Sequence, residues 1–459
     1  MDECESHESL IDTSKDPENY GDTSDDVDSD DIDGKKHAPM EEGLHMFATL
    51  LKMFIGSGVL FLPKSFSNGG WLFSSVMMLV MAVITGICIQ RLVECRQTVK
   101  GSYGYLGQRA AGIWGRRAVD ISVVLSQAGF CCVYIIFIAR NVLQLLNTSS
   151  CWLDGSWLWL IILLEWFLFT PLTFVRNLSS FGPTNLAADA LIVGSVIAVF
   201  AWCAQGFISA PSGSNLNSVV VFNQNSFSLM LGTAIYAFEG VGMVVPVYDS
   251  LSEKAQRRFP YTMGATVALV ALLYTSFGLV PYLYIVGIQK STVGDAITMS
   301  LPRVWWTYVI QAGYCLALTF SYPLMMHPAM KIMEKGISPY IFEASTKDKQ
   351  EKSSLGLSQY TRSNIFRSFV VAVTLLVALV GSTQLDNFVS LIGCFCCTPL
   401  AFIYPCYFHL KLVKNASQSS KAVDWAIIIF GVGVFFFSTY EAIAGWSISV
   451  IDPCATVKT

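Results

Sequence analysis

Eleven long apolar runs constrain the fold of this chain more than any other feature. A helix needs about 20 mostly apolar residues to cross a bilayer, and a soluble domain does not need so many runs of that length. The sequence therefore predicts an all-α membrane protein with about eleven transmembrane helices. The runs cover residues 44–66, 71–93, 119–146, 157–175, 186–207, 227–249, 261–286, 304–328, 366–384, 387–410 and 423–447.

Composition supports the same fold class. Charged residues make up 14% of the chain and hydrophobic residues 53%, whereas a soluble domain carries about a quarter charged residues. Most of the thirteen cysteines fall within apolar runs, so we interpret them as small hydrophobic residues rather than as a disulfide framework.

The acidic residues are concentrated at the N-terminus. Residues 1–42 hold 16 of the 33 acidic residues, which leaves a body with a net charge of +9. This segment is rich in Asp, Ser and Thr, so we predict a disordered acidic cytoplasmic tail, without the pattern of a signal peptide. Ser24 and Ser29, each followed by two aspartates, resemble phosphorylation sites, although a solvated spacer explains the composition as well. Residues 43–450 form the predicted transmembrane transporter domain, and 451–459 a short non-cytoplasmic C-terminus.

The distribution of Lys and Arg predicts the orientation. If the N-terminal tail is cytoplasmic, the loops on that side carry 20 Lys and Arg residues and the opposite side carries 4, as the positive-inside rule requires. The sequon at Asn147 then lies on the non-cytoplasmic side and is a candidate glycosylation site. The sequons at Asn177 and Asn415 face the cytoplasm, so we expect them to stay unmodified.

Two of the apolar runs carry the same helix-breaking pattern. The first reads Gly-Ser-Gly from Gly56 and reaches Pro63, and the sixth reads Gly-Val-Gly from Gly240 and reaches Pro246. Gly and Pro both weaken a helix interior, so we predict that both helices are interrupted. Because five helices separate their starts, the two cross in opposite directions, as inverted repeats require. The alternative is that these glycines only permit close helix packing.

An interruption inside the membrane exposes backbone groups that must face a polar cavity or a ligand. The half-helix after Gly58 offers N–H donors and a positive dipole to a carboxylate, and carbonyl groups around Gly240 can receive an ammonium group. A zwitterionic amino acid fits both ends. Glu239, beside the second break, is a candidate proton-binding group because burial disfavours its charged form; a carboxyl group that locks the fold through hydrogen bonds is the alternative. Glu165 also lies within an apolar run, where it could reach an interface or pair structurally.

No pattern of a catalytic or cofactor site is present in the sequence. It contains no H-E-x-x-H, no phosphate-binding loop of the Walker type and no G-x-S-x-G. The cluster of Cys394, Cys396 and Cys397 lies in an apolar run without further zinc ligands, so core packing is favoured over a metal site. We expect no enzyme activity, no cofactor, no metal and no nucleic-acid partner.

Three motifs in order resemble the amino acid/auxin permease family of transmembrane amino acid transporters. The first-helix stretch from Leu50 to Gly70, the Ser-Tyr-Gly segment at 102–107 and the sixth-helix stretch from Gly232 to Gly240 are most similar to its proton-coupled and fungal vacuolar branch. The resemblance covers about residues 40–450.

This resemblance implies a LeuT-type 5+5 inverted repeat plus one extra helix, and alternating-access transport of amino acids across a vacuolar or lysosomal membrane, with the plasma membrane as the second choice. Our leading hypothesis is that the transported amino acids are neutral. A proton is favoured over sodium as the coupling ion. Proton-coupled animal members place a His where this chain has Thr49, which puts more weight on Glu239. The expected substrate-binding residues are Ile55, Gly56, Ser57, Gly58, Tyr236, Phe238 and Gly240, with Ser126 and Ser321 added from the polarity of helices three and eight.

Two other classes of function remain open. In a receptor, the same site would bind an amino acid while the N-terminal tail signals to a cytoplasmic partner. A channel would conduct without saturating, and breaks that close at the membrane midplane argue against it.

Overall fold

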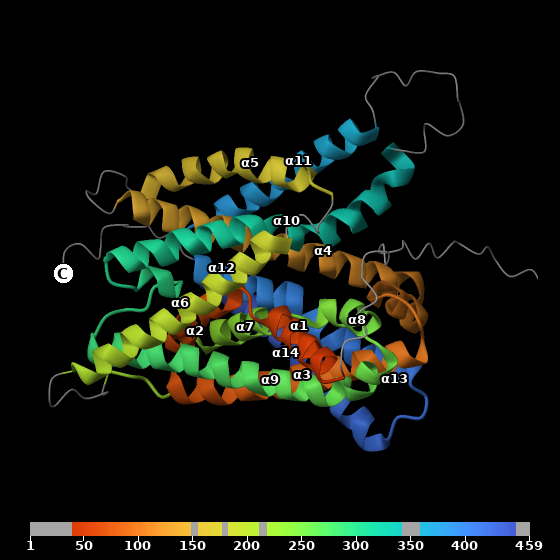
Figure 1. Ribbon diagram of the computed structural model, residues 1–459. Coiled ribbons are helices and arrows are strands. Elements are labelled where there is room, and N and C mark those ends of the chain that lie inside the picture. Colours follow the sequence, from red (N-terminus) through yellow and green to blue (C-terminus); the bar gives the residue numbers. More distant parts are fainter. Residues whose placement is uncertain (1–38, 148–154, 177–181, 211–217, 342–358, 447–459) are drawn as a thin grey trace, which may run out of the picture. The chain divides into compact units, whose positions relative to one another are not determined.

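The computed structural model describes residues 39–147, 155–176, 182–210, 218–341 and 359–446 (Figure 1), and all regular secondary structure in these ranges is helical. The chain divides into two compact units, Met1–Glu42 and Gly43–Thr459. Most of the predicted acidic tail, with Ser24 and Ser29, therefore lies outside the described residues, as does the predicted C-terminal segment 451–459. The predicted all-α fold class is confirmed.

Eleven spans follow from the helices of the described residues. Ten are long and apolar enough to cross a membrane, and a bent pair, Met46–Phe54 with Ser57–Gly69, makes the eleventh. The first span comprises α1 (Pro39–Phe54), η2 (Ser57–Phe61) and α2 (Leu62–Gly69). The others are α3 (Trp71–Thr98), α4 (Tyr103–Leu146), α5 (Leu158–Phe174) after η3 (Gly155–Trp157), α6 (Gly182–Ile208), α7 (Phe227–Ala237) with α8 (Val241–Asp249), α9 (Glu253–Tyr282) with η5 (Leu283–Ile288), α10 (Trp305–Ile341), α11 (Gln359–Gly381), α12 (Leu385–Leu391) continued through η8 (Ile392–Cys397) and η9 (Pro399–Ile403) to α13 (Tyr404–Leu412), and α14 (Gln418–Ala444).

Helix α4 begins earlier than the apolar run that predicted it. Ser102 caps its N-terminus by accepting a hydrogen bond from the Tyr105 N–H group at 3.4 Å, an arrangement that Ser at this position favours. The helix is interrupted at Ala111 and Gly112, where Gly112 has φ +67°. A polar helical segment thus precedes the apolar span, within residues that the sequence assigned to a loop.

Helices that lie five spans apart pack against each other. Figure 1 shows α3 beside α9, α4 beside α10 and α5 beside α11, and each of these pairs is in direct contact. Likewise, α2 of the first span contacts α7 of the sixth. An inverted repeat of five helices relates these partners in pairs, and α14 is the helix left over. It packs against α7, α12 and α13.

Large apolar side chains cover the outside of the bundle. Five of them, on five different spans, are between 62% and 71% exposed: Val83, Phe167, Leu272, Val380 and Phe436. A soluble protein rarely exposes apolar side chains so widely. Their exposure is what a lipid-facing surface requires, and it supports the multi-pass membrane assignment.

Backbone packs directly on backbone where the sixth and tenth spans meet. A Cβ atom added to Gly393 of η8 would lie 1.8 Å from the carbonyl oxygen of Gly232 in α7. The tenth span is π-helical on this stretch, through η8 and η9. Helices in membranes approach this closely only where small residues face each other, and this contact holds α7 in place beside the second break.

Candidate functional site

The first span is interrupted where the sequence predicts. Helix α1 ends at Phe54, η2 begins at Ser57, and the helix axis bends by 43° between them. Gly56 lies between the two with an extended backbone, φ −135° and ψ −154°. Within the described residues, the N–H groups of Gly56, Ser57 and Gly58 have no hydrogen-bond acceptor. The η2–α2 segment thus begins with three free donors, as the prediction of a carboxylate site requires.

The sixth span is interrupted in the corresponding place. Helix α7 ends at Ala237 and α8 begins at Val241, with Gly240 at φ −159° and ψ −7° between them. In the part of the chain that the structure describes, no donor reaches the carbonyl oxygens of Phe238 and Glu239. The second break therefore presents free acceptors, complementary to the free donors of the first.

The two breaks lie against each other. A Cβ atom on Gly58 would come within 2.8 Å of the Ala237 Cα atom, so only glycine permits this approach. The Ser57 Oγ atom lies 3.3 Å from the Tyr236 hydroxyl oxygen. The structure thus brings together the residues that the sequence proposed for the site on the first and sixth spans.

Aromatic side chains surround this junction. The Tyr236 ring, 2% exposed, packs edge-on against Phe61 of η2 at 5.9 Å between ring centroids and tilted against Phe130 of α4 at 4.5 Å. Tyr134, one turn along α4 from Phe130, lies beside Ser57 and Tyr236. The lining of the site is therefore mostly aromatic, with hydroxyl groups as its polar part.

A single tyrosine on α9 contacts both breaks. The Tyr274 hydroxyl lies 2.6 Å from the Phe54 carbonyl oxygen, the last of α1, and 3.2 Å from the Ala237 carbonyl oxygen, the last of α7. Its side chain is fully buried and its ring packs against Phe238 at 5.2 Å. Both carbonyl groups have lost their helical partners, and one hydroxyl group replaces them.

Glu239 is close to the start of α8. Its Oε1 atom lies 3.6 Å from the place of a Cβ atom on Gly242, and the side chain is partly buried. On the other side of the first break, Lys52 forms an ion pair with Asp189 of α6 at 2.5 Å. The lysine, one turn before the break, thus pairs with an acidic group of α6.

The two serines assigned from helix polarity use their hydroxyl groups within their own helices. The Ser126 Oγ atom donates to the Val123 carbonyl oxygen at 3.1 Å, and the Ser321 Oγ atom donates to that of Ala317 at 2.9 Å. Ser126 lies one turn from Phe130 on α4, so it borders the junction. Asn147 is 1% exposed at the end of α4; the rest of its sequon lies outside the described residues, and its glycosylation stays a prediction.

Sequence reasoning missed Tyr274, Phe130, Tyr134 and Phe61. Tyr274 lies within a run that also contains Tyr282 and Tyr284, so residue type alone does not single it out. The Phe and Tyr residues of α4 and η2 occur in apolar segments where aromatic residues are common. Only the packing of the helices shows which of them meet at the breaks.

Ion pairs join the spans at the end of the bundle that includes the connection between α9 and α10. Arg140 of α4 pairs with Asp295 in that connection and donates from Nε to the Ser382 carbonyl oxygen at 2.9 Å. Nearby, the Asn68 amide of α2 donates to the Asp386 carboxylate of α12 at 2.7 Å. These contacts connect both halves of the bundle on the side predicted to be non-cytoplasmic.

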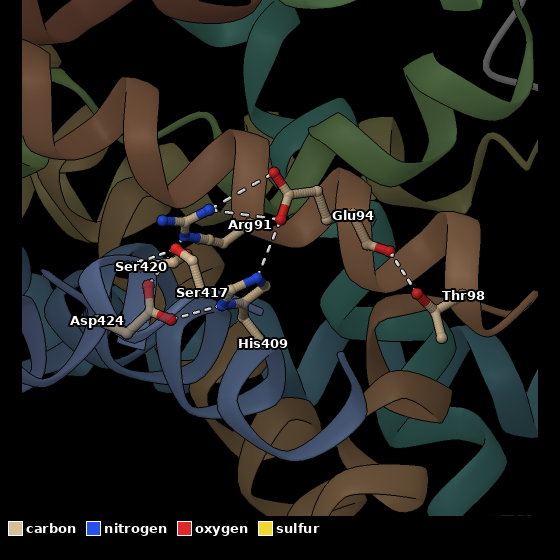
Figure 2. A network of polar contacts seen from close by, with 7 residues as sticks. All are labelled: Arg91, Glu94, Thr98, His409, Ser417, Ser420 and Asp424. Atoms are coloured by element: carbon tan, nitrogen blue, oxygen red, sulfur yellow. Dashed lines mark hydrogen bonds and ion pairs between the residues drawn. The ribbon is translucent and has the colours of Figure 1, made fainter. Parts of the chain in front are cut away.

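A second polar cluster joins α3, α13 and α14 at the opposite end (Figure 2). Figure 2 shows His409 between two carboxylates: its Nδ1 atom lies 2.5 Å from Asp424 Oδ2, and its Nε2 atom lies 2.9 Å from Glu94 Oε2. Arg91 donates from Nε to Asp424 Oδ1 at 2.9 Å. Asp424 and His409 are buried, and these charge-assisted contacts compensate for the cost of removing them from water.

The chain matches one protein family over most of its length. Residues 44–444 match the family described as "Transmembrane amino acid transporter protein". The chain is similar to "Vacuolar amino acid transporter 3" of Saccharomyces cerevisiae, at 33% identity over 87% of this chain, and to the protein of the same name from Schizosaccharomyces pombe, at 32% identity over 85%. It spans 56% of the length of each of these two relatives.

Two further similarities extend beyond fungi. The "Amino acid transporter AVT3A" of Arabidopsis thaliana is 30% identical, over 86% of this chain and 88% of its own length. Among solved structures, the chain is similar to MhsT in complex with L-phenylalanine, with a TM-score of 0.49 and 10% identity, over 87% of this chain and 97% of that one.

Proposed function

The chain belongs to the transmembrane amino acid transporter family, and from this premise we propose that it carries neutral amino acids across a vacuolar membrane by alternating access. The fungal relatives are named vacuolar amino acid transporters, which supports both the class of substrate and the membrane. Transport then requires a site near the midplane that two halves of the protein can expose in turn.

One observation carries this proposal. The N–H groups of Gly56, Ser57 and Gly58 are free donors on one break, and the Phe238 and Glu239 carbonyl groups are free acceptors on the other. A carboxylate binds to the donors at a helix N-terminus, and an ammonium group binds to carbonyl oxygens. The α-carbon of an amino acid carries both groups, so one substrate can satisfy both sets.

The surroundings of the breaks support a neutral side chain. The aromatic rings of Phe61, Phe130 and Tyr236 and the Ser57 hydroxyl group line the junction. Apolar and aromatic linings with few polar groups are typical of pockets for small apolar ligands. A cationic or anionic side chain would need a charged partner here, and among the described residues of the two breaks Glu239 is the one acidic group.

We assign proton binding beside the breaks to Glu239. Its carboxyl group lies next to unwound backbone deep in the sixth span, where a proton and a substrate can influence each other. Because Thr49 stands where proton-coupled animal members of the family place a histidine, we assign the coupling proton to an acidic group. The orientation with a cytoplasmic N-terminus remains part of this proposal, since it rests on the loop charges alone.

Counterflow in liposomes tests the proposal directly. The purified full-length chain is reconstituted in liposomes loaded with one unlabelled amino acid at a time, and uptake of the labelled form is followed. We expect transient accumulation for several neutral amino acids and none for lysine or aspartate. A receptor would bind amino acids without such flux. Absence of counterflow for all twenty amino acids, at neutral and at acidic pH, would refute the transport function.

A further inference from the structure

Glu165, near the middle of α5, has no hydrogen-bond partner. Its side chain is 5% exposed, and both carboxyl oxygens lack a donor in the part of the chain that the structure describes. A carboxylate in such a place is costly because nothing replaces its hydration. Buried polar groups in proteins are almost always paired, so an unpaired acid in the membrane calls for a specific role.

Among the described residues, no positively charged group interacts with Glu165. On α10, Cys315 and Tyr322 lie close enough to interact with it electrostatically, and the Tyr322 hydroxyl group is already bonded to the Thr374 Oγ1 atom of α11 at 2.8 Å. On α4, the thiol of Cys131 donates to the Tyr322 carbonyl oxygen and that of Cys132 donates to the Thr374 carbonyl oxygen.

One ion pair on the packed helices lies further along α5. Arg367 of α11 pairs with Glu334 of α10 at 2.8 Å and donates to the Thr173 carbonyl oxygen of α5. Thr173 is eight residues along α5 from Glu165, or about 12 Å at the rise of an α-helix. Glu165 therefore keeps its proton in this conformation, because an ionised carboxylate would have no partner.

A stripe of three side chains, two of them buried and polar and the third a partly buried cysteine, runs along α10 toward Glu165. Thr307, Gln311 and Cys315 follow at four-residue spacing, each about 6 Å further along the helix, and Cys315 lies within electrostatic range of Glu165. Thr307 and Gln311 are each 1% exposed. The stripe begins at the end of α10 next to the connection from α9, on the side predicted to be non-cytoplasmic.

Several oxygens on this stripe are also unpaired. The Gln311 amide nitrogen donates to the Gln144 Oε1 atom at 3.2 Å and to the Thr298 carbonyl oxygen at 2.9 Å. Yet the Gln311 Oε1, Thr307 Oγ1 and Thr298 Oγ1 atoms have no partner among the described residues. Thr298 belongs to η6 (Ile297–Met299), in the connection between α9 and α10. Buried oxygens of this kind are the usual ligands of internal water molecules.

We propose that Glu165 is a proton-binding site, and that its proton exchanges with the non-cytoplasmic side through water held by the oxygens of Thr298, Thr307 and Gln311. The proton moves along hydrogen bonds from water to water and ends on a Glu165 carboxyl oxygen. This site is separate from Glu239, which lies beside the breaks. That the bound proton drives transport rests on the proposed function; the binding itself does not.

Chemical modification tests the binding without any transport assay. Dicyclohexylcarbodiimide is apolar and reacts with protonated carboxyl groups inside membranes. The full-length chain in liposomes is treated with a short pulse at pH values from about 5 to about 9, and peptides are analysed by mass spectrometry. We expect Glu165 to be modified at low pH and much less at high pH. No modification at any pH, or equal modification at all of them, would overturn the proposal.

Substitutions on the stripe show whether the pH response of the modification comes from the proposed proton pathway or from the pH dependence of the reagent itself. Thr307→Val keeps the shape of the side chain and removes the unpaired hydroxyl group. With the path interrupted, Glu165 should stay protonated during the pulse, so its modification should lose most of its pH response. Thr266→Val on α9 is the matched control, because that buried hydroxyl group donates to the Thr262 carbonyl oxygen; it should behave like the wild type. Equal responses of both variants would refute the pathway.

Transport gives an independent test. Glu165→Gln mimics the protonated acid, so we expect counterflow within about twofold of the wild type and loss of the acceleration by a pH gradient. Glu441→Gln on α14 is the control and should keep that acceleration. If Glu165→Gln still responds to the gradient like the wild type, the site does not couple to transport. If the wild type itself shows no counterflow, the proposed function fails while the modification result still decides whether Glu165 exchanges its proton.

Discussion

Tyr274 shows how one side chain compensates for two broken helices. Its hydroxyl group faces the Phe54 and Ala237 carbonyl oxygens, and a hydroxyl group has one proton to donate. The shorter contact of 2.6 Å, to Phe54, is therefore the stronger bond, and the contact to Ala237 at 3.2 Å is the weaker one. The residue ties the ends of α1 and α7 to the same point on α9, so both breaks keep a defined geometry before substrate arrives.

We predict that Tyr274→Phe weakens substrate binding more than it slows transport. An unpaired buried carbonyl group costs about 1–3 kcal/mol, and an order of magnitude in affinity corresponds to about 1.4 kcal/mol. The KM for a transported amino acid should rise about tenfold, while the maximal rate changes by less than about threefold. Initial rates of counterflow over a range of substrate concentrations provide the measurement.

The same helix supplies a control for this variant. The Tyr282 hydroxyl group accepts a hydrogen bond from the Val220 N–H group at 3.3 Å, away from both breaks, and its side chain is buried. Tyr282→Phe removes a buried hydroxyl group from α9 without touching the break carbonyls, so its KM should stay within about twofold of the wild type. Equal KM values for the two variants would contradict the role of Tyr274.

At this scale, the sequence predicts the backbone part of the site better than the side-chain part. Gly56, Gly58 and Gly240 predict the breaks because Gly and Pro disfavour a helix interior. Tyr274 and Phe130 cannot be found in this way, because their role depends on contacts between spans far apart in the sequence. Ser126 and Ser321, the residues assigned by polarity, donate their hydroxyl hydrogen bonds to carbonyl groups of their own helices.

The ends of α3, α13 and α14 are joined by buried charges rather than by apolar packing alone. Asp424 accepts from Arg91 and lies next to His409 (Figure 2), and its side chain is fully buried. Because α14 lies outside the paired helices, this cluster ties the extra helix to one span from each half of the repeat.

We predict that Asp424→Asn lowers the free energy of unfolding by about 3–5 kcal/mol, since removing one partner leaves the other charges buried and unpaired. Thermal unfolding of the purified protein in detergent provides the measurement, with a clear fall in Tm as the expected result. Asp120→Asn is the control: Asp120 pairs with Arg116 across 3.8 Å at a partly exposed position, where a salt bridge contributes about 1 kcal/mol or less. Similar Tm values for both variants would contradict a stabilising cluster.

The helix boundaries predicted from the sequence agree closely with the structure in the apolar spans and less closely outside them. All eleven predicted runs coincide with spans of the structure, because about 20 apolar residues have one stable arrangement in a bilayer. The helical segment at the start of α4 was assigned to a loop, since its polar residues carry no such signal. The π-helical stretches of the tenth span likewise depend on the close approach of Gly393 to Gly232, which no local pattern reveals.

For the molecule as a whole, the inverted repeat relates the two halves and their broken helices to each other. Two glycine–proline patterns five helices apart predict two antiparallel broken helices, and the structure places these breaks in contact with complementary unpaired groups. The resemblance to amino acid permeases is confirmed by the match of residues 44–444 to that family. Selectivity among amino acids depends on side chains contributed by several spans, and a sequence alone does not show which of these side chains lie together.

A structure of the full-length chain with a transported amino acid bound is the decisive test of the site between the two breaks. We predict density for the ligand between the two breaks, with its carboxylate at the N–H groups of Gly56, Ser57 and Gly58 and its ammonium group at the carbonyl oxygens of Phe238 and Glu239. A ligand bound elsewhere in the bundle, or two uninterrupted α-helices through these segments, would contradict the account.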